Sequence, residues 1–275
     1  MIQKVSSAWL SFTVLTMSTL LFLAHSSFAN TSPQSHNEFC LEAGNLDNFK
    51  QIASEADNRL SFKNAGGIFG EGVCWWHSRF QRSATYLSVF RPDLSKPTLA
   101  QARDIIHTII HNNYVVEIPG YANLADFSTD FHEEIQKALN RWQLRDATLR
   151  FAWVRGLWNS PYGDAAKLQA IMEKLDEQVE KDSRITYLKL QLKGIPSHAW
   201  LVIGMEEIPS GYELQIIDSN FPELVHYKYT YGDTSFSYGK YGKFFPYVEQ
   251  TKDFTKITTA IHNYCLQYQA PRDRE

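Results

Sequence analysis

The sequence predicts an α+β protein, because helical periodicity fills the first two thirds of the chain and strand-like alternation follows it. The most regular helical pattern lies at 164–181, where apolar residues recur at helical spacing. After Ser183 the period changes, and Leu188, Leu190 and Leu192 alternate with polar residues as in a half-buried strand. Helices that come first and antiparallel strands that come later are the element order of an α+β fold.

The helical part is expected to extend over about 40–182. Its helices are predicted from the spacing of apolar residues and from helix breakers such as Pro92. One short segment is rich in residues that favour strands. Residues 30–37 are polar and are expected to be disordered. The predicted helices before the one at 164–181 are 46–60, 74–89, 97–111 and 130–142, and the short strand is 114–118.

The β-rich part is expected to extend over about 183–250. Strands are predicted at 198–205 and 212–218, with Pro209, Ser210 and Gly211 in the loop between them. The aromatic segment 226–247 is expected to form hairpins and loops, either as a groove for peptide or glycan or as a cap on the sheet. A final helix is predicted at about 252–268.

The N-terminus resembles an export signal. Residues 8–24 carry no charge, and small residues at Ser27 and Ala29 form a cleavage site, so residues 1–29 are predicted to be a signal peptide. An uncleaved anchor is the alternative, since this stretch is at the lower limit for crossing a bilayer. The mature chain, 30–275, is expected to be a single domain that is secreted or periplasmic and does not contact the membrane.

The charge of the chain limits the kinds of partner that it is expected to bind. The formal net charge is −3, and no basic run of the kind that follows phosphates is present, so nucleic acid is not an expected partner.

The three cysteines suggest one bridge and one thiol. Cys40 and Cys265 lie near the two ends of the mature chain, which tend to be close together in space, so a disulfide between them is expected in an oxidising compartment. Two buried, unbridged cysteines are the alternative. The bridge would leave Cys74 as the thiol to explain.

Cys74 lies where a catalytic thiol would be expected. A glycine-rich turn, 66–72, leads into the helix that it begins, and a helix N-terminus favours a thiolate and offers N–H groups to an oxyanion. The alternative is an inert cysteine buried beside the aromatic Trp75 and Trp76.

His198 and Asp218 are predicted to complete a triad. Symmetric pairing of their strands about the 206–211 loop would set His198 opposite Asp218, Trp200 opposite Ile216 and Val202 opposite Leu214. A bulge would change this register. The alternative for His198 is a histidine that hydrogen-bonds a backbone carbonyl, and the alternative for Asp218 is a turn-forming aspartate. Asn220 could replace Asp218 as the third member of the triad.

The other histidines do not suggest a cofactor. His77 lies one turn after Cys74 and is expected to pack or cap. His107 and His111 have the spacing of a shared metal site, but no further ligand is evident, so neither a metal nor a cofactor is predicted.

These motifs resemble the papain-like cysteine peptidase superfamily, in its bacterial Cys-His-Asp branch. The resemblance is carried by Gly72-x-Cys74-Trp75, by His198-Ala-Trp-Leu-Val-Ile-Gly204 and by Ile-Ile-Asp218-Ser-Asn220. It implies a helical lobe with the cysteine, a sheet lobe with the histidine and aspartate, and a peptidase or amidase acting on peptides or proteins, cell-wall peptides among them.

One family feature is missing, and two other functions remain open. The family's oxyanion glutamine is replaced by Ile68, and Asn64 is a candidate substitute. His198-Ala-Trp200 also resembles transglutaminase-like acyltransferases, whose Cys-to-His separation is usually much shorter. A catalytically inactive binding protein of papain-like fold is the third possibility.

Overall fold

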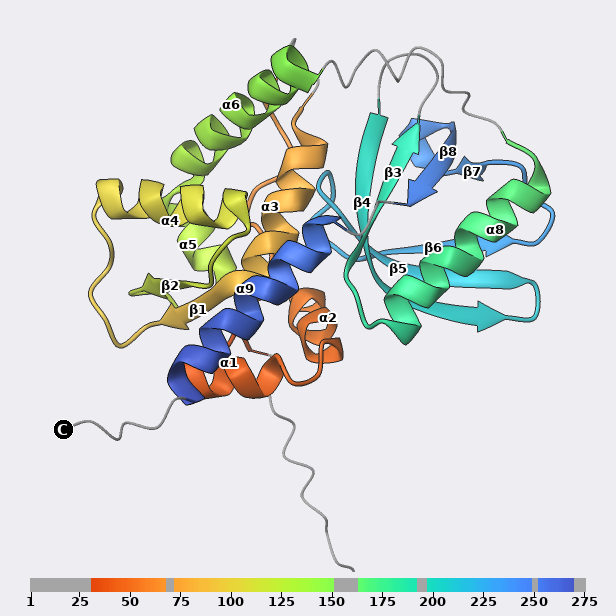
Figure 1. Ribbon diagram of the computed structural model, residues 1–275. Helices are drawn as coiled ribbons and strands as arrows, with labels where there is room; N and C mark the ends of the chain where they lie inside the picture. The colour runs from red at the N-terminus through yellow and green to blue at the C-terminus, as the bar shows by residue number, and fades with distance from the viewer. Residues whose placement is uncertain (1–30, 68–71, 151–162, 192–196, 249–251, 270–275) are drawn as a thin grey trace, which may run out of the picture.

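The computed structural model describes residues 31–67, 72–150, 163–191, 197–248 and 252–269. Most helices gather on one side, and an antiparallel six-stranded sheet lies on the other (Figure 1). The predicted α+β class is therefore confirmed. The predicted signal peptide, 1–29, lies outside the described residues.

The helical side is built around α3, Cys74–Leu87, which packs against α4 and α6. A parallel pair of short strands, β1 and β2, accompanies these helices. Buried apolar side chains of α3, α4, α5 and α6 form one continuous core there. The elements on this side are α1 His36–Glu42, α2 Asp47–Ser54, the 3₁₀ turn η1 Ala56–Asn58, α3, β1 Ser88–Arg91, α4 Leu99–His111, β2 Val116–Pro119, α5 Leu124–Asp130 and α6 His132–Arg150.

Several predicted boundaries on this side were wrong. The helix predicted at 46–60 ends at Ser54, the helix predicted at 74–89 ends at Leu87, and the helix predicted at 130–142 is preceded by the separate helix α5. In the second case the chain turns into β1, because Ser88–Arg91 pairs with β2. β-Branched and aromatic residues such as Val89 and Phe90 fit a strand well.

The disorder expected over 30–37 was also wrong for the described residues. Ser32 is buried, and its hydroxyl donates to Asn58 Oδ1 at 2.6 Å. The carbonyl of Pro33 accepts from Phe90 N at 2.9 Å, and Ser35 caps α1. The polar composition of this segment did not indicate disorder, because its polar groups form hydrogen bonds that hold it against the helical side of the protein.

The sheet has the strand order β6-β5-β4-β3-β8-β7. Helix α8 covers one face through a core that includes Trp200, and α2, α3 and α9 pack on the other face. The elements are α8 Ala165–Asp176, the π-helical turn η3 Glu177–Lys181, β3 Thr186–Gln191, β4 Ser197–Ile208, β5 Gly211–Asp218, β6 Val225–Thr230, β7 Phe236–Ser237, the 3₁₀ turn η4 Gly239–Tyr241, β8 Lys243–Val248 and α9 Lys252–Gln269.

The aromatic segment caps the sheet, as the second of the two interpretations expected. The rings of Tyr227, Phe236, Tyr238 and Phe244 surround the indole of Trp200, with ring centroids 5.3–6.3 Å from it. Aromatic pairs at this separation pack favourably. This cluster fixes the position of β4 two residues from His198.

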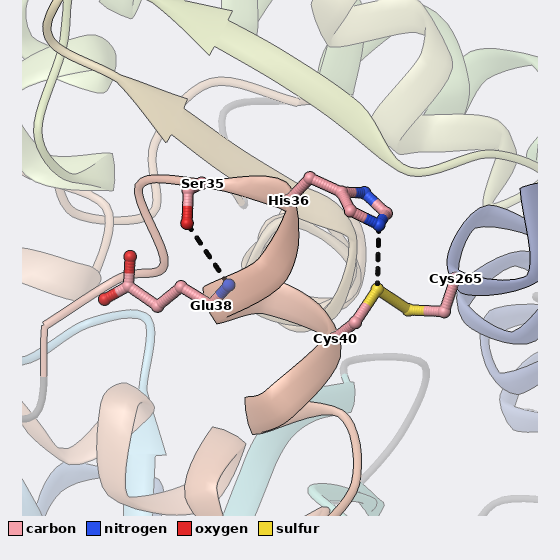
Figure 2. Close-up of a disulfide and its surroundings, with 5 residues drawn as sticks. All are labelled: Ser35, His36, Glu38, Cys40 and Cys265. Carbon is pink, nitrogen blue, oxygen red and sulfur yellow. Dashed lines mark hydrogen bonds between the residues drawn. A yellow bond between two sulfur atoms is a disulfide. The ribbon is translucent and has the colours of Figure 1, made fainter. Parts of the chain in front are cut away.

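A disulfide joins the two ends of the described chain. Cys40 of α1 and Cys265 of α9 are bridged, with their Cα atoms 5.7 Å apart, and His36 Nε2 lies 3.6 Å from Cys40 Sγ (Figure 2). The predicted bridge is thus confirmed, and Cys74 remains a thiol. Among the described helices, none is long and apolar enough to cross a membrane.

Removal of this bridge is expected to destabilise the fold without disturbing Cys74. The bridge closes a loop of 225 residues, so the Cys40→Ala, Cys265→Ala variant should lose about 2–5 kcal/mol of unfolding free energy. Urea titration with tryptophan fluorescence measures this loss, and alkylation of Cys74 in the folded variant is the control. An unchanged urea midpoint would contradict the prediction.

Candidate active site

Cys74 is the first residue of α3 and is partly exposed. The turn before it is closed by Gly72 N, which donates to Gly66 O at 2.8 Å. Gly72 has a φ of +88°, and a Cβ there would clash with Asn64 Nδ2. Only glycine adopts this conformation without strain and leaves room for Asn64, so the expected need for glycine at position 72 is confirmed, whereas residues 68–71 of the predicted turn lie outside the described residues.

Because Cys74 begins α3, its sulfur lies near the unpaired N–H groups of the first helical turn. The first backbone hydrogen bond of the helix runs from His77 N to Val73 O at 2.8 Å, and no side chain caps the helix. The N–H groups of a first helical turn point outward and, with the macrodipole, favour negative charge. The site can therefore stabilise both a thiolate and an oxyanion.

His198 meets both predicted partners. Its Nε2 lies 2.8 Å from Asp218 Oδ1, and its ring also hydrogen-bonds the side chain of Cys74. Since Nε2 faces Asp218, Nδ1 is the nitrogen left for the thiol. Helix α3 is held beside β4 by Ser78 Oγ, which donates to Ala199 O at 3.4 Å. The structure thus brings Cys74, His198 and Asp218 together.

The predicted register of the hairpin was wrong by two residues. Trp200, and not His198, lies opposite Asp218, and Val202 lies opposite Ile216. The turn is tighter than expected, with only Pro209 and Ser210 between the strands, and a bulge interrupts the pairing between Val202 and Gly204. A two-residue shift keeps side chains on the same face, so His198 reaches Asp218 diagonally.

Asp218 is a fully buried carboxylate surrounded by donors. Besides His198, it accepts from Trp200 Nε1 at 2.7 Å, from Asn220 N at 2.9 Å and from the Tyr241 hydroxyl at 3.2 Å. Burial raises the pKa of Asp218, but the hydrogen bond and charge of His198 and the other donors outweigh it, and the pKa lies below its ordinary value. The carboxylate is held ionised.

The imidazole of His198 is held protonated. Its residue is only 5% exposed, and this burial lowers its pKa. Hydrogen bonds to Asp218 and Cys74, and their charges, outweigh burial and raise the pKa of His198 to about 9. A cationic ring beside the sulfur is the charge distribution that stabilises a thiolate.

Tyr241 was not predicted as a site residue. Its ring stacks on His198 with centroids 4.7 Å apart, and its hydroxyl lies 3.2 Å from His198 Nε2. Burial first, and then the charge of Asp218, raise its pKa, so the phenol stays neutral. It lies in η4, and nothing local in an aromatic-rich stretch distinguishes this tyrosine from its neighbours.

Asn64 and Asn220 connect the two sides of the site. Asn64 Oδ1 accepts from Val73 N, while Asn64 Nδ2 donates to Asn220 Oδ1 at 3.1 Å. Asn220 Nδ2 in turn donates to the Tyr241 hydroxyl at 2.5 Å. Asn220 therefore supports Asp218 and does not replace it. Ile68, at the position of the family's glutamine, lies outside the described residues.

Among the remaining histidines, His77 packs inside the protein as expected. His77 is buried and its Nε2 lies 3.0 Å from Phe62 O, while burial lowers its pKa to about 4. The rings of His107 and His111 are in contact, with centroids 4.0 Å apart. Within the part of the chain that the structure describes, no group of three or more histidine, cysteine or acidic residues could hold a metal.

Comparison with known proteins adds no relative. No family model matches the chain, and neither a curated protein nor a solved structure is significantly similar to it.

Proposed function

We propose that this protein is an exported cysteine hydrolase that acts on peptides or related amides through a thioester acyl-enzyme. The observation that carries the proposal is the linked arrangement of Cys74, His198 and Asp218. The thiol lies at a helix N-terminus and hydrogen-bonds an imidazole whose other nitrogen is bound to a buried carboxylate. Nucleophile, base and orienting group are the three parts of an activated thiol.

In the proposed reaction, the Cys74 sulfur attacks the amide carbonyl as a thiolate, with the proton held on His198. The backbone N–H of Cys74 stabilises the oxyanion of the tetrahedral intermediate. His198 then gives its proton to the leaving amine, and the thioester remains on Cys74. Water, deprotonated by His198, hydrolyses this thioester and releases the acid. Asp218 keeps the ring oriented and stabilises its positive charge throughout.

A papain-like fold is supported by the arrangement of the lobes. The cysteine begins a helix on the helical side, whereas the histidine and aspartate lie on an antiparallel sheet. Asn64 is proposed as a positioning residue and not as the missing oxyanion donor, because its amide bridges Val73 and Asn220.

Export is proposed from two observations. The sequence begins with a signal-like segment, and the Cys40–Cys265 disulfide is of a kind that persists in oxidising compartments. We therefore place the protein in a periplasm or outside the cell, with peptide or protein substrates that include cell-wall peptides.

A small activated ester tests the proposal without knowledge of the natural substrate. Mixing p-nitrophenyl acetate with the mature protein is expected to give a burst of p-nitrophenol and an acetyl adduct on Cys74, located by peptide mapping. The adduct should decay to acetate in water. Absence of any adduct on Cys74 would support the inactive binding protein instead.

The same assay separates hydrolysis from acyl transfer. The transglutaminase-like alternative uses the same residues, and the Trp200 of its motif does bind Asp218. Added glycinamide should capture little of the acetyl group from a hydrolase. Capture that dominates over hydrolysis at millimolar amine would favour the acyltransferase.

A further inference from the structure

A cavity of about 90 Å³ lies beside Asp218, which forms part of its lining. It is lined by the segment 59–63, by His77 and Gln81 of α3, and by residues 217–219, 221 and 222 at and after the end of β5. Its volume exceeds what one water molecule needs. The cavity therefore has room for a small ligand.

Two residues that line this cavity carry buried side-chain atoms that have no hydrogen-bond partner. Arg59 is only 8% exposed, yet its Nε and Nη1 atoms are buried and unpaired. Ser219 is 5% exposed, and its hydroxyl is unpaired as well. Buried N–H groups of a guanidinium that have no acceptor are costly, so these atoms are donors that lack acceptors.

The neighbouring groups do not supply that complement. Asp218 lines the cavity, but its oxygens accept from His198, Trp200, Asn220 and Tyr241. Glu223 and Glu55 act on Arg59 only through their charge, and burial outweighs them and lowers its pKa. The Gln81 amide is bound to Leu60 N and Asn58 O. The exposed Lys63 adds a second positive charge at the rim.

We propose that this cavity binds a small carboxylate, held by Arg59 and Ser219. A carboxylate offers two oxygens that accept several hydrogen bonds, and guanidinium–carboxylate pairs are among the strongest in proteins. Neither residue takes part in the proposed reaction at Cys74. The carboxylate belongs either to a separate small acid or to an acidic group of the substrate, and both sources present the same atoms to Arg59.

Titration with sodium acetate tests the site. The melting temperature of the mature protein should rise with acetate and then saturate, relative to sodium chloride at equal ionic strength. The Arg59→Gln and Ser219→Ala variants should lose this saturable rise, whereas Arg103→Gln, which removes an exposed arginine paired with Glu134, should retain it. Ser219→Ala changes the side-chain volume little, so it still tests the site if Arg59→Gln does not fold.

The proposal is overturned if the wild-type melting temperature shows no saturable rise, or if Arg59→Gln shows the same rise. Acylation of Cys74 distinguishes the two sources. If the carboxylate belongs to the substrate, Arg59→Gln should slow acylation by mono-p-nitrophenyl succinate but not by p-nitrophenyl butyrate, and acetate should compete with the acidic ester. A separate small acid should bind without this selectivity, so failure of the ester assay leaves the melting result intact.

Discussion

Replacing His198 with alanine is expected to slow acylation of Cys74 by p-nitrophenyl acetate by about 10²–10⁴-fold, the usual contribution of a positioned acid–base group. The ring supplies the positive charge beside the sulfur, with a pKa raised to about 9, and removes the thiol proton. The rate constant of the p-nitrophenol burst measures this loss. The Cys74 side chain itself is unchanged in the variant.

A second histidine provides the control for this effect. His226 is exposed on β6, and its Nδ1 lies 3.8 Å from Glu213 Oε1 on the surface of the sheet. It has no part in the proposed reaction. The His226→Ala variant should acylate at the wild-type rate. If His198→Ala and His226→Ala both keep the wild-type burst, His198 does not activate Cys74.

The Asp218→Asn substitution should lower both the stability of the fold and the pKa of His198. The carboxylate accepts from four donors, and an amide in its place would direct an NH₂ group at one of them. Loss of one partner of a buried ion pair costs about 3–5 kcal/mol. Urea titration near pH 6 measures this, because at that pH the raised pKa of His198 still contributes its full stability.

The effect on His198 has a defined pH window. In the wild type, the stability gained from the protonated ring is complete below its ordinary pKa of 6.5 and is lost as the pH rises through about 9. In Asp218→Asn this loss should shift to lower pH. The exposed Asp93→Asn is the matched control, since a surface pair with Arg91 contributes little to stability. Equal urea midpoints for both variants would contradict the role of Asp218.

The convergence of the triad could be predicted because it depends on few features. The glycine-rich turn places Cys74 at a helix start, and strand periodicity places His198 and Asp218 on one face. That face is unchanged by a register shift of two residues, so the prediction held although the pairing was wrong. The bulge next to Ile203 leaves no clear mark in the sequence, since Ile203 is an ordinary strand residue.

Other parts of the site depend on contacts between distant segments. Tyr241 reaches His198 from the turn η4 between β7 and β8, and Asn64 reaches Asn220 across 156 residues. Arg59 looks like one more surface charge in the sequence, yet it is buried beside a cavity that it lines together with Ser219. Such features follow from tertiary packing and not from local pattern.

The most direct test of the central claim is alkylation of the mature, non-reduced protein with iodoacetamide between pH 4 and pH 9, followed by intact mass and peptide mapping. An activated Cys74 predicts a single adduct on that residue, formed rapidly below pH 7. The account would be contradicted if Cys74 formed no adduct. It would also be contradicted if the alkylation rate rose only near the ordinary pKa of a free cysteine, about 8.5.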